Sequence, residues 1–114
     1  MSDCIFCNII SGKSASQMVY QDNLASAFRD IHPVASTHIL VVPNKHFASV
    51  NELTPEDESL VGHLFTVARE LARQEGIDQS GYRLIINTGP NAGQGVFHLH
   101  LHLIGGQRMR FPMG

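Results

Sequence analysis

Residues 96–104, VFHLHLHLI, alternate histidine with leucine over most of their length. Successive side chains of a β-strand point to opposite faces of the sheet. As a strand, this segment would place His98, His100 and His102 on one face and their leucine neighbours in the core on the other. The alternation therefore predicts a strand with one apolar face and one face lined by imidazoles.

Three further segments have the composition of strands. Residues 24–30 (LASAFRD), 38–43 (HILVVP) and 82–87 (YRLIIN) are short, apolar and bounded by turn-forming residues. Pro33 disfavours a continuous strand between the first two, which we expect to pair. The loop TGPNAGQG, residues 88–95, separates the third segment from the histidine-rich strand.

One long helix is predicted from Thr54 to Gly76. Thr54, Pro55 and the acidic residues that follow form a typical helix start, and Gly76 stands where a glycine C-cap belongs. Between them an apolar stripe recurs at helical spacing, formed by Leu60, Leu64, Val67 and Leu71. Two to five strands with one long helix give an α+β fold, in which the helix covers one face of an antiparallel sheet.

The overall composition is that of a soluble globular protein. The 114 residues carry a formal net charge of −2 and are 43% hydrophobic, so we expect one domain, 1–114, and no long nucleic acid as partner. No stretch approaches the length of a membrane span, and the N-terminus has no basic, apolar leader. We therefore expect a cytoplasmic protein with no membrane partner. A small phosphate-bearing substrate remains compatible with this charge.

The alternating histidines indicate chemistry near neutral pH, because imidazole is the side chain that titrates there. It can act as a base, an acid or a nucleophile. A purely structural role is one alternative. A zinc site is another, because histidines at i and i+2 of a strand can share one metal, although a further ligand would have to come from upstream.

The two cysteines of the chain, Cys4 and Cys7, form a C-x-x-C pair. In a reducing compartment this spacing indicates a metal or redox pair before a structural disulfide. Two ordinary buried thiols are the plain alternative.

The segment HLHLHLI resembles the motif that names the histidine-triad (HIT) superfamily. AFRDIHPVASTHILVVPNKH is similar to the central segment of that family, and GYRLIINTG to its next strand. The tail GGQRMRFPMG resembles the Hint-like branch of purine nucleoside phosphoramidases. The resemblance implies a five-stranded antiparallel sheet with one long helix and a short N-terminal helix, and it implies a homodimer.

For catalysis, the resemblance assigns the nucleophile to His100, which would carry a nucleotidyl intermediate. The main-chain carbonyl of His98 would orient His100, and His102 would donate to a phosphate oxygen. His38 corresponds to an additional active-site histidine of the family. Because such a site stabilises charge through positioned donors, we expect no catalytic metal.

The implied substrate is a small nucleotide, a purine nucleoside phosphoramidate or related adenylate. Asp30 matches the ribose-binding acid of the family. The other nucleotide-binding residues by this resemblance are Asn87 on the phosphate side, Gln94 and Gly95, and the apolar residues Ile5, Phe6, Ile9 and Ile31 around the base. Gly95 stands where animal members have a serine near the leaving group, which predicts slower or different turnover of amine leaving groups.

Some bacterial-type members of the family carry such an N-terminal cysteine pair and bind one zinc through it. The matching residues here are Cys4, Cys7, His46 and His98, a donor set that suits tetrahedral zinc. Two alternative functions stay open: hydrolysis of dinucleoside polyphosphates, and a non-catalytic module that binds nucleotide and zinc.

Overall fold

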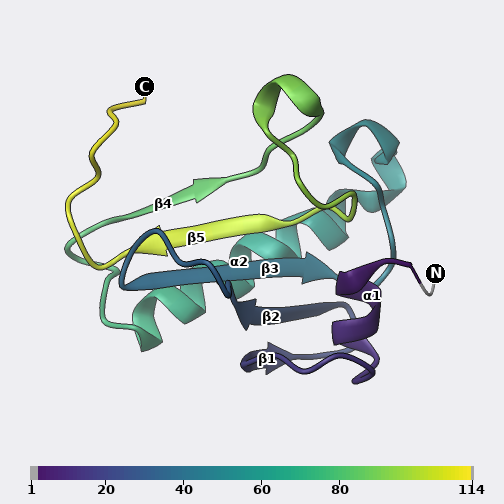
Figure 1. The fold of residues 1–114 in the computed structure, drawn as a ribbon, viewed down its shortest axis with the longest axis horizontal. Helices are drawn as coiled ribbons and strands as arrows, with labels where there is room; N and C mark the ends of the chain where they lie inside the picture. The colour runs from purple at the N-terminus through teal and green to yellow at the C-terminus, as the bar shows by residue number, and fades with distance from the viewer. Residues whose placement is uncertain (1–2, 114) are drawn as a thin grey trace.

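The computed structural model describes residues 3–113 as a five-stranded antiparallel sheet with helices on both sides (Figure 1). The strands are β1 (Met18–Gln21), β2 (Ala25–Arg29), β3 (Thr37–Pro43), β4 (Tyr82–Ile85) and β5 (Leu101–Gly105), and their order across the sheet is β1-β2-β3-β5-β4. The predicted α+β fold is confirmed. Strand β5 therefore lies between β3 and β4, and the imidazole-bearing segment runs through the middle of the molecule.

Helix α2 (Glu58–Gln74) covers one face of the sheet, as predicted. It is preceded by a 3-10 turn, Pro55–Asp57, in which the Asp57 carboxylate accepts the Thr54 backbone N–H at 2.8 Å. Gly76 adopts a φ of +74°, the left-handed conformation that lets the chain leave the helix. The apolar stripe of α2 packs on residues that include Ile39, Leu101 and Leu103.

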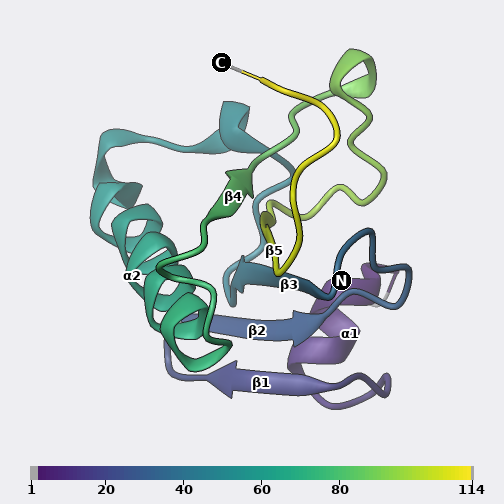
Figure 2. The same cartoon turned by 90° about the vertical axis from the view of Figure 1, so that its left-hand side faces the viewer.

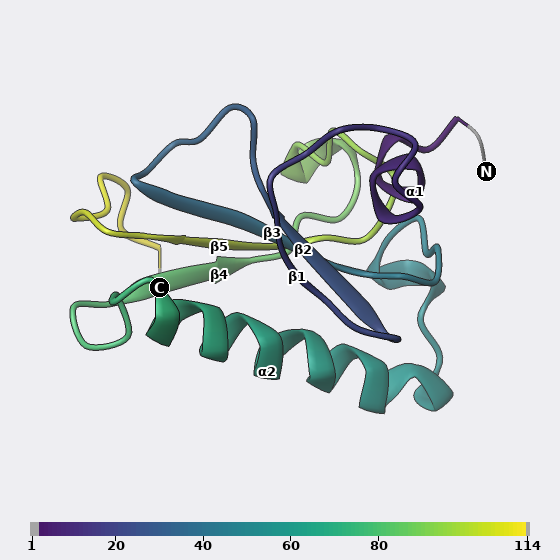
Figure 3. The ribbon, with the colours of Figure 1, turned by 90° about the horizontal axis from the view of Figure 1, so that it is seen from below.

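The short helix α1 (Ile5–Ile10) lies on the opposite face of the sheet from α2 (Figure 3). Its Phe6 and Ile9 pack on Phe28, Leu40 and Val42. These strand residues alternate with the ones that face α2, so the sheet has two apolar sides. A second view shows α2 on one side of the strands and α1 on the other (Figure 2).

The predicted strand over residues 96–104 is too long at its N-terminal end, because the ladder between β3 and β5 begins at Val41 and Leu101. Upstream of it, the Leu99 N–H donates to the Phe47 carbonyl in the segment that follows β3. The alternation itself holds, since Leu99, Leu101 and Leu103 are all buried on the α2 side.

Smaller differences occur elsewhere. The expected strand 82–87 ends at Ile85, and the loop after it contains a 3-10 turn, Pro90–Ala92. A third such turn, Val50–Glu52, precedes α2. Among residues 3–113, no helix is both long and apolar enough to cross a membrane.

Candidate active site and metal cluster

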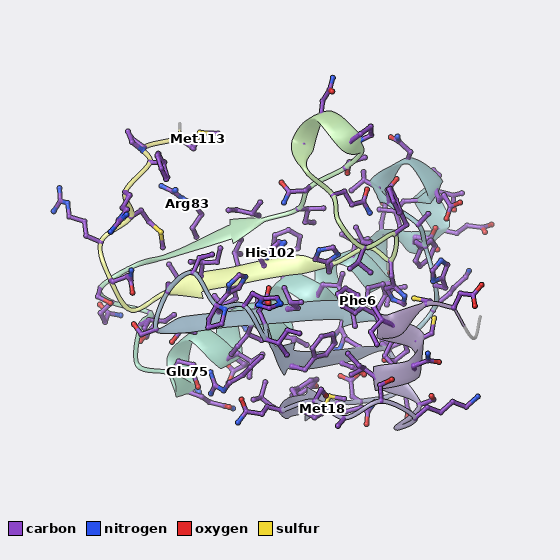
Figure 4. All side chains as sticks on the ribbon, viewed as in Figure 1. Phe6, Met18, Glu75, Arg83, His102 and Met113 are labelled. Atoms are coloured by element: carbon purple, nitrogen blue, oxygen red, sulfur yellow. The ribbon has the colours of Figure 1, made fainter. Side chains whose placement is uncertain are left out.

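A cavity of about 420 Å³ opens on the α1 side of the sheet. This volume is in the range of small-molecule sites. Its lining has an apolar part, formed by side chains of α1 and β2, and a polar part that includes His100 and His102. Figure 4 shows Phe6 and His102 on this side of the molecule. The predicted nucleotide-binding residues that line the cavity are Ile5, Phe6, Ile9, Asp30, Ile31, Asn87, Gly95, His100 and His102.

The orientation of His100 is determined by one backbone contact. Its Nδ1 lies 2.8 Å from the carbonyl oxygen of His98. A carbonyl oxygen can only accept, so Nδ1 must carry the proton and Nε2 of the neutral ring keeps its lone pair. The ring of Phe6 packs edge-on against it, with centroids 5.2 Å apart. His100 thus offers the cavity a held imidazole with a nucleophilic nitrogen.

His102 belongs to a chain of three polar side chains. The Val34 N–H donates to Nδ1 of His38, which leaves the proton of neutral His38 on Nε2. That nitrogen lies 2.9 Å from Nδ1 of His102 and 3.3 Å from Oδ2 of Asp30. If His38 donates to His102, the remaining N–H of His102 is on Nε2. His102 is then a hydrogen-bond donor for an anion in the cavity.

Burial favours the neutral forms of His38 and His102. It lowers the pKa of His102 to about 4, with further lowering from the neighbouring His100 and His38. Burial also lowers the pKa of His38, although the Asp30 carboxylate acts in the opposite direction. Asp30 itself is held by the His32 N–H at 2.8 Å. The ligand atoms of Asp30, His38 and His102 are close enough together to hold a metal ion, but here they contact one another.

A second cluster, formed by Cys4, Cys7, His46 and His98, lies at the N-terminal end of α1; we call it the Cys2His2 cluster. Its four ligand atoms lie within 4.8 Å of one another. Nδ1 of His98 is 3.1 Å from Nδ1 of His46, 3.3 Å from Sγ of Cys4 and 3.6 Å from Sγ of Cys7. In tetrahedral zinc with bonds of about 2.0 to 2.3 Å, ligand atoms stand about 3.3 to 3.8 Å apart. The cluster fits zinc.

The hydrogen bonds of His98 agree with a ligand role. Its Nε2 lies 2.9 Å from the carbonyl oxygen of Pro43, so the proton is on Nε2 and Nδ1 faces the two thiols with a lone pair. A metal-bound histidine typically makes this kind of contact through its other nitrogen. The side chain is fully buried. Both cysteines are free of disulfide bonds.

Of the predicted catalytic and nucleotide-binding residues, three do not line the cavity. The rings of His38 and His98 lie behind His102 and in the Cys2His2 cluster. Gln94 is also buried and is not among the lining residues, so its contact with nucleotide stays a prediction. Its amide donates to the carbonyls of Ala48 and Val96 and accepts the Gly89 N–H, so it holds the loop that precedes the triad.

Other lining residues were not predicted. They are Ala15, Ser16, Phe28, Arg29, His32, Leu40, Gly93 and Val96. Phe28 and Leu40 could have been found from the strand alternation that separates them from the α2-facing residues. Ala15 and Ser16 lie in a short loop without periodicity, and nothing in the sequence marks them.

The HIT domain profile matches residues 11–109. The chain belongs to the HIT family. The purine nucleoside phosphoramidase of Escherichia coli K12 is 50% identical over 112 residues, 98% of this chain and 91% of that protein.

Two solved HIT structures share the fold closely. The HIT family hydrolase of Legionella pneumophila Philadelphia 1 has a TM-score of 0.95 and 42% identity, covering 98% of this chain and 100% of that one. A histidine triad protein of Clostridium difficile has a TM-score of 0.95 and 41% identity, covering 99% and 98%. The predicted family and enzyme class are therefore confirmed: this HIT protein is a hydrolase.

Proposed function

We propose that this HIT hydrolase cleaves purine nucleoside phosphoramidates through a nucleotide carried transiently on His100. The observation that carries the proposal is the contact between Nδ1 of His100 and the His98 carbonyl, which leaves Nε2 unprotonated beside the cavity. The E. coli phosphoramidase, 50% identical over nearly the whole chain, supports this substrate class.

In the first step, Nε2 of His100 attacks the α-phosphorus and the bond from phosphorus to the leaving amine breaks. The amine leaves with the electron pair of that bond and takes up a proton. Water then attacks the same phosphorus, the bond to Nε2 breaks, and nucleoside monophosphate is released. Splitting the displacement into two steps makes each easier than direct hydrolysis.

The other site residues bind the nucleotide and stabilise the negative charge that develops on its phosphate. The Nε2–H of His102 donates to a phosphate oxygen as negative charge develops, with His38 holding the ring from behind. Asn87 is a further donor on the phosphate side, and Asp30 accepts from the ribose hydroxyls. The purine base lies against the apolar part of the lining, where Ile5, Phe6, Ile9 and Ile31 line the cavity.

Trapping the intermediate tests this mechanism. A radiolabelled adenosine phosphoramidate is mixed with a small excess of protein, quenched within the first turnover and digested. We expect acid-labile label on the peptide that contains His100, and none on His100→Ala. Hydrolysis by the wild type without label on this peptide would reject the covalent mechanism. Faster turnover of a diadenosine polyphosphate than of the phosphoramidate would reject the substrate class.

We also propose that the Cys2His2 cluster binds one structural zinc ion. Zinc there would fix His98, and with it the carbonyl that orients His100. Two free thiols as ligands suit a reducing compartment, in line with the expected cytoplasmic location. Elemental analysis should find about one zinc per chain, and chelation should lower the melting temperature. If the purified protein contains no zinc and a chelator leaves its melting temperature unchanged, the site is ruled out.

We further propose that the enzyme is a homodimer. Strand β4 is at one edge of the sheet, and its four side chains are all only half-buried. An edge strand exposes unpaired backbone groups that a second copy can cover. Phe65 on α2 is 42% exposed and adds apolar surface. Light scattering after size exclusion should give twice the chain mass of 12.5 kDa, and a monomer at micromolar concentration would contradict the proposal.

A further inference from the structure

Glu75 follows the last residue of α2 and accepts hydrogen bonds from two strand ends. Arg29 binds its carboxylate with both terminal nitrogens, NH1 to Oε1 at 3.1 Å and NH2 to Oε2 at 2.8 Å. The Thr37 hydroxyl donates to the same Oε1 at 3.2 Å. The carboxylate therefore joins the end of β2 to the start of β3. Figure 4 shows Glu75 at the end of α2.

Each strand residue that Glu75 holds is the chain neighbour of a residue of the candidate active site. Arg29 is followed by Asp30, and Thr37 by His38. Successive side chains of a strand point to opposite faces, so the side chains of Asp30 and His38 leave the sheet on the face opposite to the Arg29 and Thr37 side chains that Glu75 holds. Arg29 itself also borders the cavity, next to Asp30. The contact between His38 Nε2 and Asp30 Oδ2, 3.3 Å, spans the same two strand ends.

The contact between Arg29 and Glu75 is better suited to fixing the distance between two elements than to stabilising the fold. The side chains of Arg29 and Glu75 are 34% and 22% exposed, and ion pairs near the surface contribute little free energy. A two-nitrogen contact between arginine and a carboxylate, however, has a fixed planar geometry. Hydrogen bonds from Arg29 also lower the pKa of Glu75, so the carboxylate stays ionised near neutral pH.

We propose that Glu75 is a positioning residue of the active site, which sets the separation of Asp30 from His38 and thereby the orientation of His102. It touches neither substrate nor reacting atoms. The part that concerns ribose rests on the proposed function, since it takes Asp30 to bind the sugar. The part that concerns the rings of His38 and His102 does not.

The test compares Glu75→Gln with Glu70→Gln. Glu70 contacts Arg73 on the exposed side of the same helix, so its variant controls for removal of a helix carboxylate. The first measurement is the ring nitrogen NMR shifts of His38 and His102 in ligand-free protein. We expect both rings to shift in Glu75→Gln and to stay unchanged in Glu70→Gln. If the Glu75→Gln variant folds and the ring nitrogen shifts of His38 and His102 are unchanged, the proposal is overturned.

The second measurement is the ratio of kcat/KM for an adenosine phosphoramidate to that for its 2′-deoxy analogue. We expect this ratio to fall about 10-fold in Glu75→Gln, because displacements below 1 Å far from the chemistry can cost up to about 100-fold. An equal loss for both substrates would overturn the role toward Asp30. If the wild type cleaves neither substrate, the proposed function fails, and the ring shifts still decide on Glu75.

Thr37→Val covers the case in which Glu75→Gln does not fold. It removes one hydroxyl without changing the shape of the side chain and leaves the Arg29 contact in place. We expect the same two measurements to move in the same direction by a smaller amount. A folded Thr37→Val with wild-type ring shifts, in the absence of folded Glu75→Gln, would overturn the proposal.

Discussion

Nδ1 of His100 lies 2.8 Å from the carbonyl oxygen of His98, and this contact gives these two histidines of the triad different roles. The backbone of His98 sets which nitrogen of His100 is free, while the side chain of His98 faces the Cys2His2 cluster. The proposed nucleophile and the proposed metal ligand are thus two residues apart on one segment. The three histidines are similar in sequence but occupy three different environments.

Replacing His100 by alanine should abolish turnover and spare binding. The cavity keeps its apolar lining and Asp30, so nucleoside monophosphate should still bind with a Kd within about 10-fold of wild type. Turnover should fall at least about 1,000-fold, since the variant has no nucleophile. Calorimetry and a coupled assay measure the two. Retained turnover in the variant would exclude His100 as nucleophile.

Loss of the proposed zinc should weaken nucleotide binding. Phe6 and Cys7 are adjacent on α1, so a helix released from its metal no longer holds the wall of the cavity. We expect Cys7→Ser to lose zinc, melt at a lower temperature and show a KM raised about 10-fold, in the range for changes near metal ligands. Ser11→Ala, at the other end of α1, is the control. A wild-type KM in zinc-free protein would show that the Cys2His2 cluster does not affect nucleotide binding in the cavity.

Gly95→Ser should alter turnover of amine leaving groups. A side chain at this position meets no heavy atom within 4 Å and the backbone needs no positive φ, so serine fits without strain. A hydroxyl there could donate to the departing amine. We expect faster release of poor leaving groups, measured as kcat across a series of amines. Gly95→Ala is the control, and identical profiles for all three proteins would show that this position does not matter.

Stability should fall at acid pH through Asp22. Burial acts to raise the pKa of this carboxyl, but hydrogen bonds from Tyr20, the Leu24 and Ala25 N–H groups and His63 lower it well below its usual range. A carboxyl with a depressed pKa stabilises the fold fully above about pH 4, its unfolded value, and loses that contribution as the pH falls further.

The matched variant is Asp22→Asn, which cannot ionise. At pH 7 it should be less stable by about 1 to 2 kcal/mol, because it loses hydrogen bonds to a charged acceptor. Between pH 4 and pH 2 its free energy of unfolding should decline less steeply than that of wild type, measured by urea titration. Parallel declines would mean that other carboxyls cause the acid sensitivity.

Local patterns predicted the parts of the fold that are long or strictly periodic. The alternation around Leu101 and the stripe through Leu64 were enough to place β5 and α2. Strand β1, with four residues and partly exposed side chains, and α1, with six residues, are too short for any period to show. The resemblance to the HIT family, rather than residue patterns, supplied α1 and the five strands.

The candidate site shows the same division. The triad and Asp30 could be found because they follow strand patterns and family motifs. The role of Gln94 could not, because whether an amide faces a cavity or holds its own loop depends on contacts with residues as distant as Ala48. The Glu75 contact is equally invisible in sequence, since 46 residues separate Glu75 from Arg29.

The alternation of leucine and histidine between Leu99 and Leu103 has a consequence for how this enzyme can change over time. Deleting or inserting one residue there would invert the faces of the residues on one side of the change, so that leucines on that side would face the cavity and histidines the core. Residues proposed as nucleophile, phosphate donor or metal ligand would be displaced together with the packing beneath α2. Single-residue changes in length along this segment are therefore incompatible with both the site and the core, because the same alternation serves both.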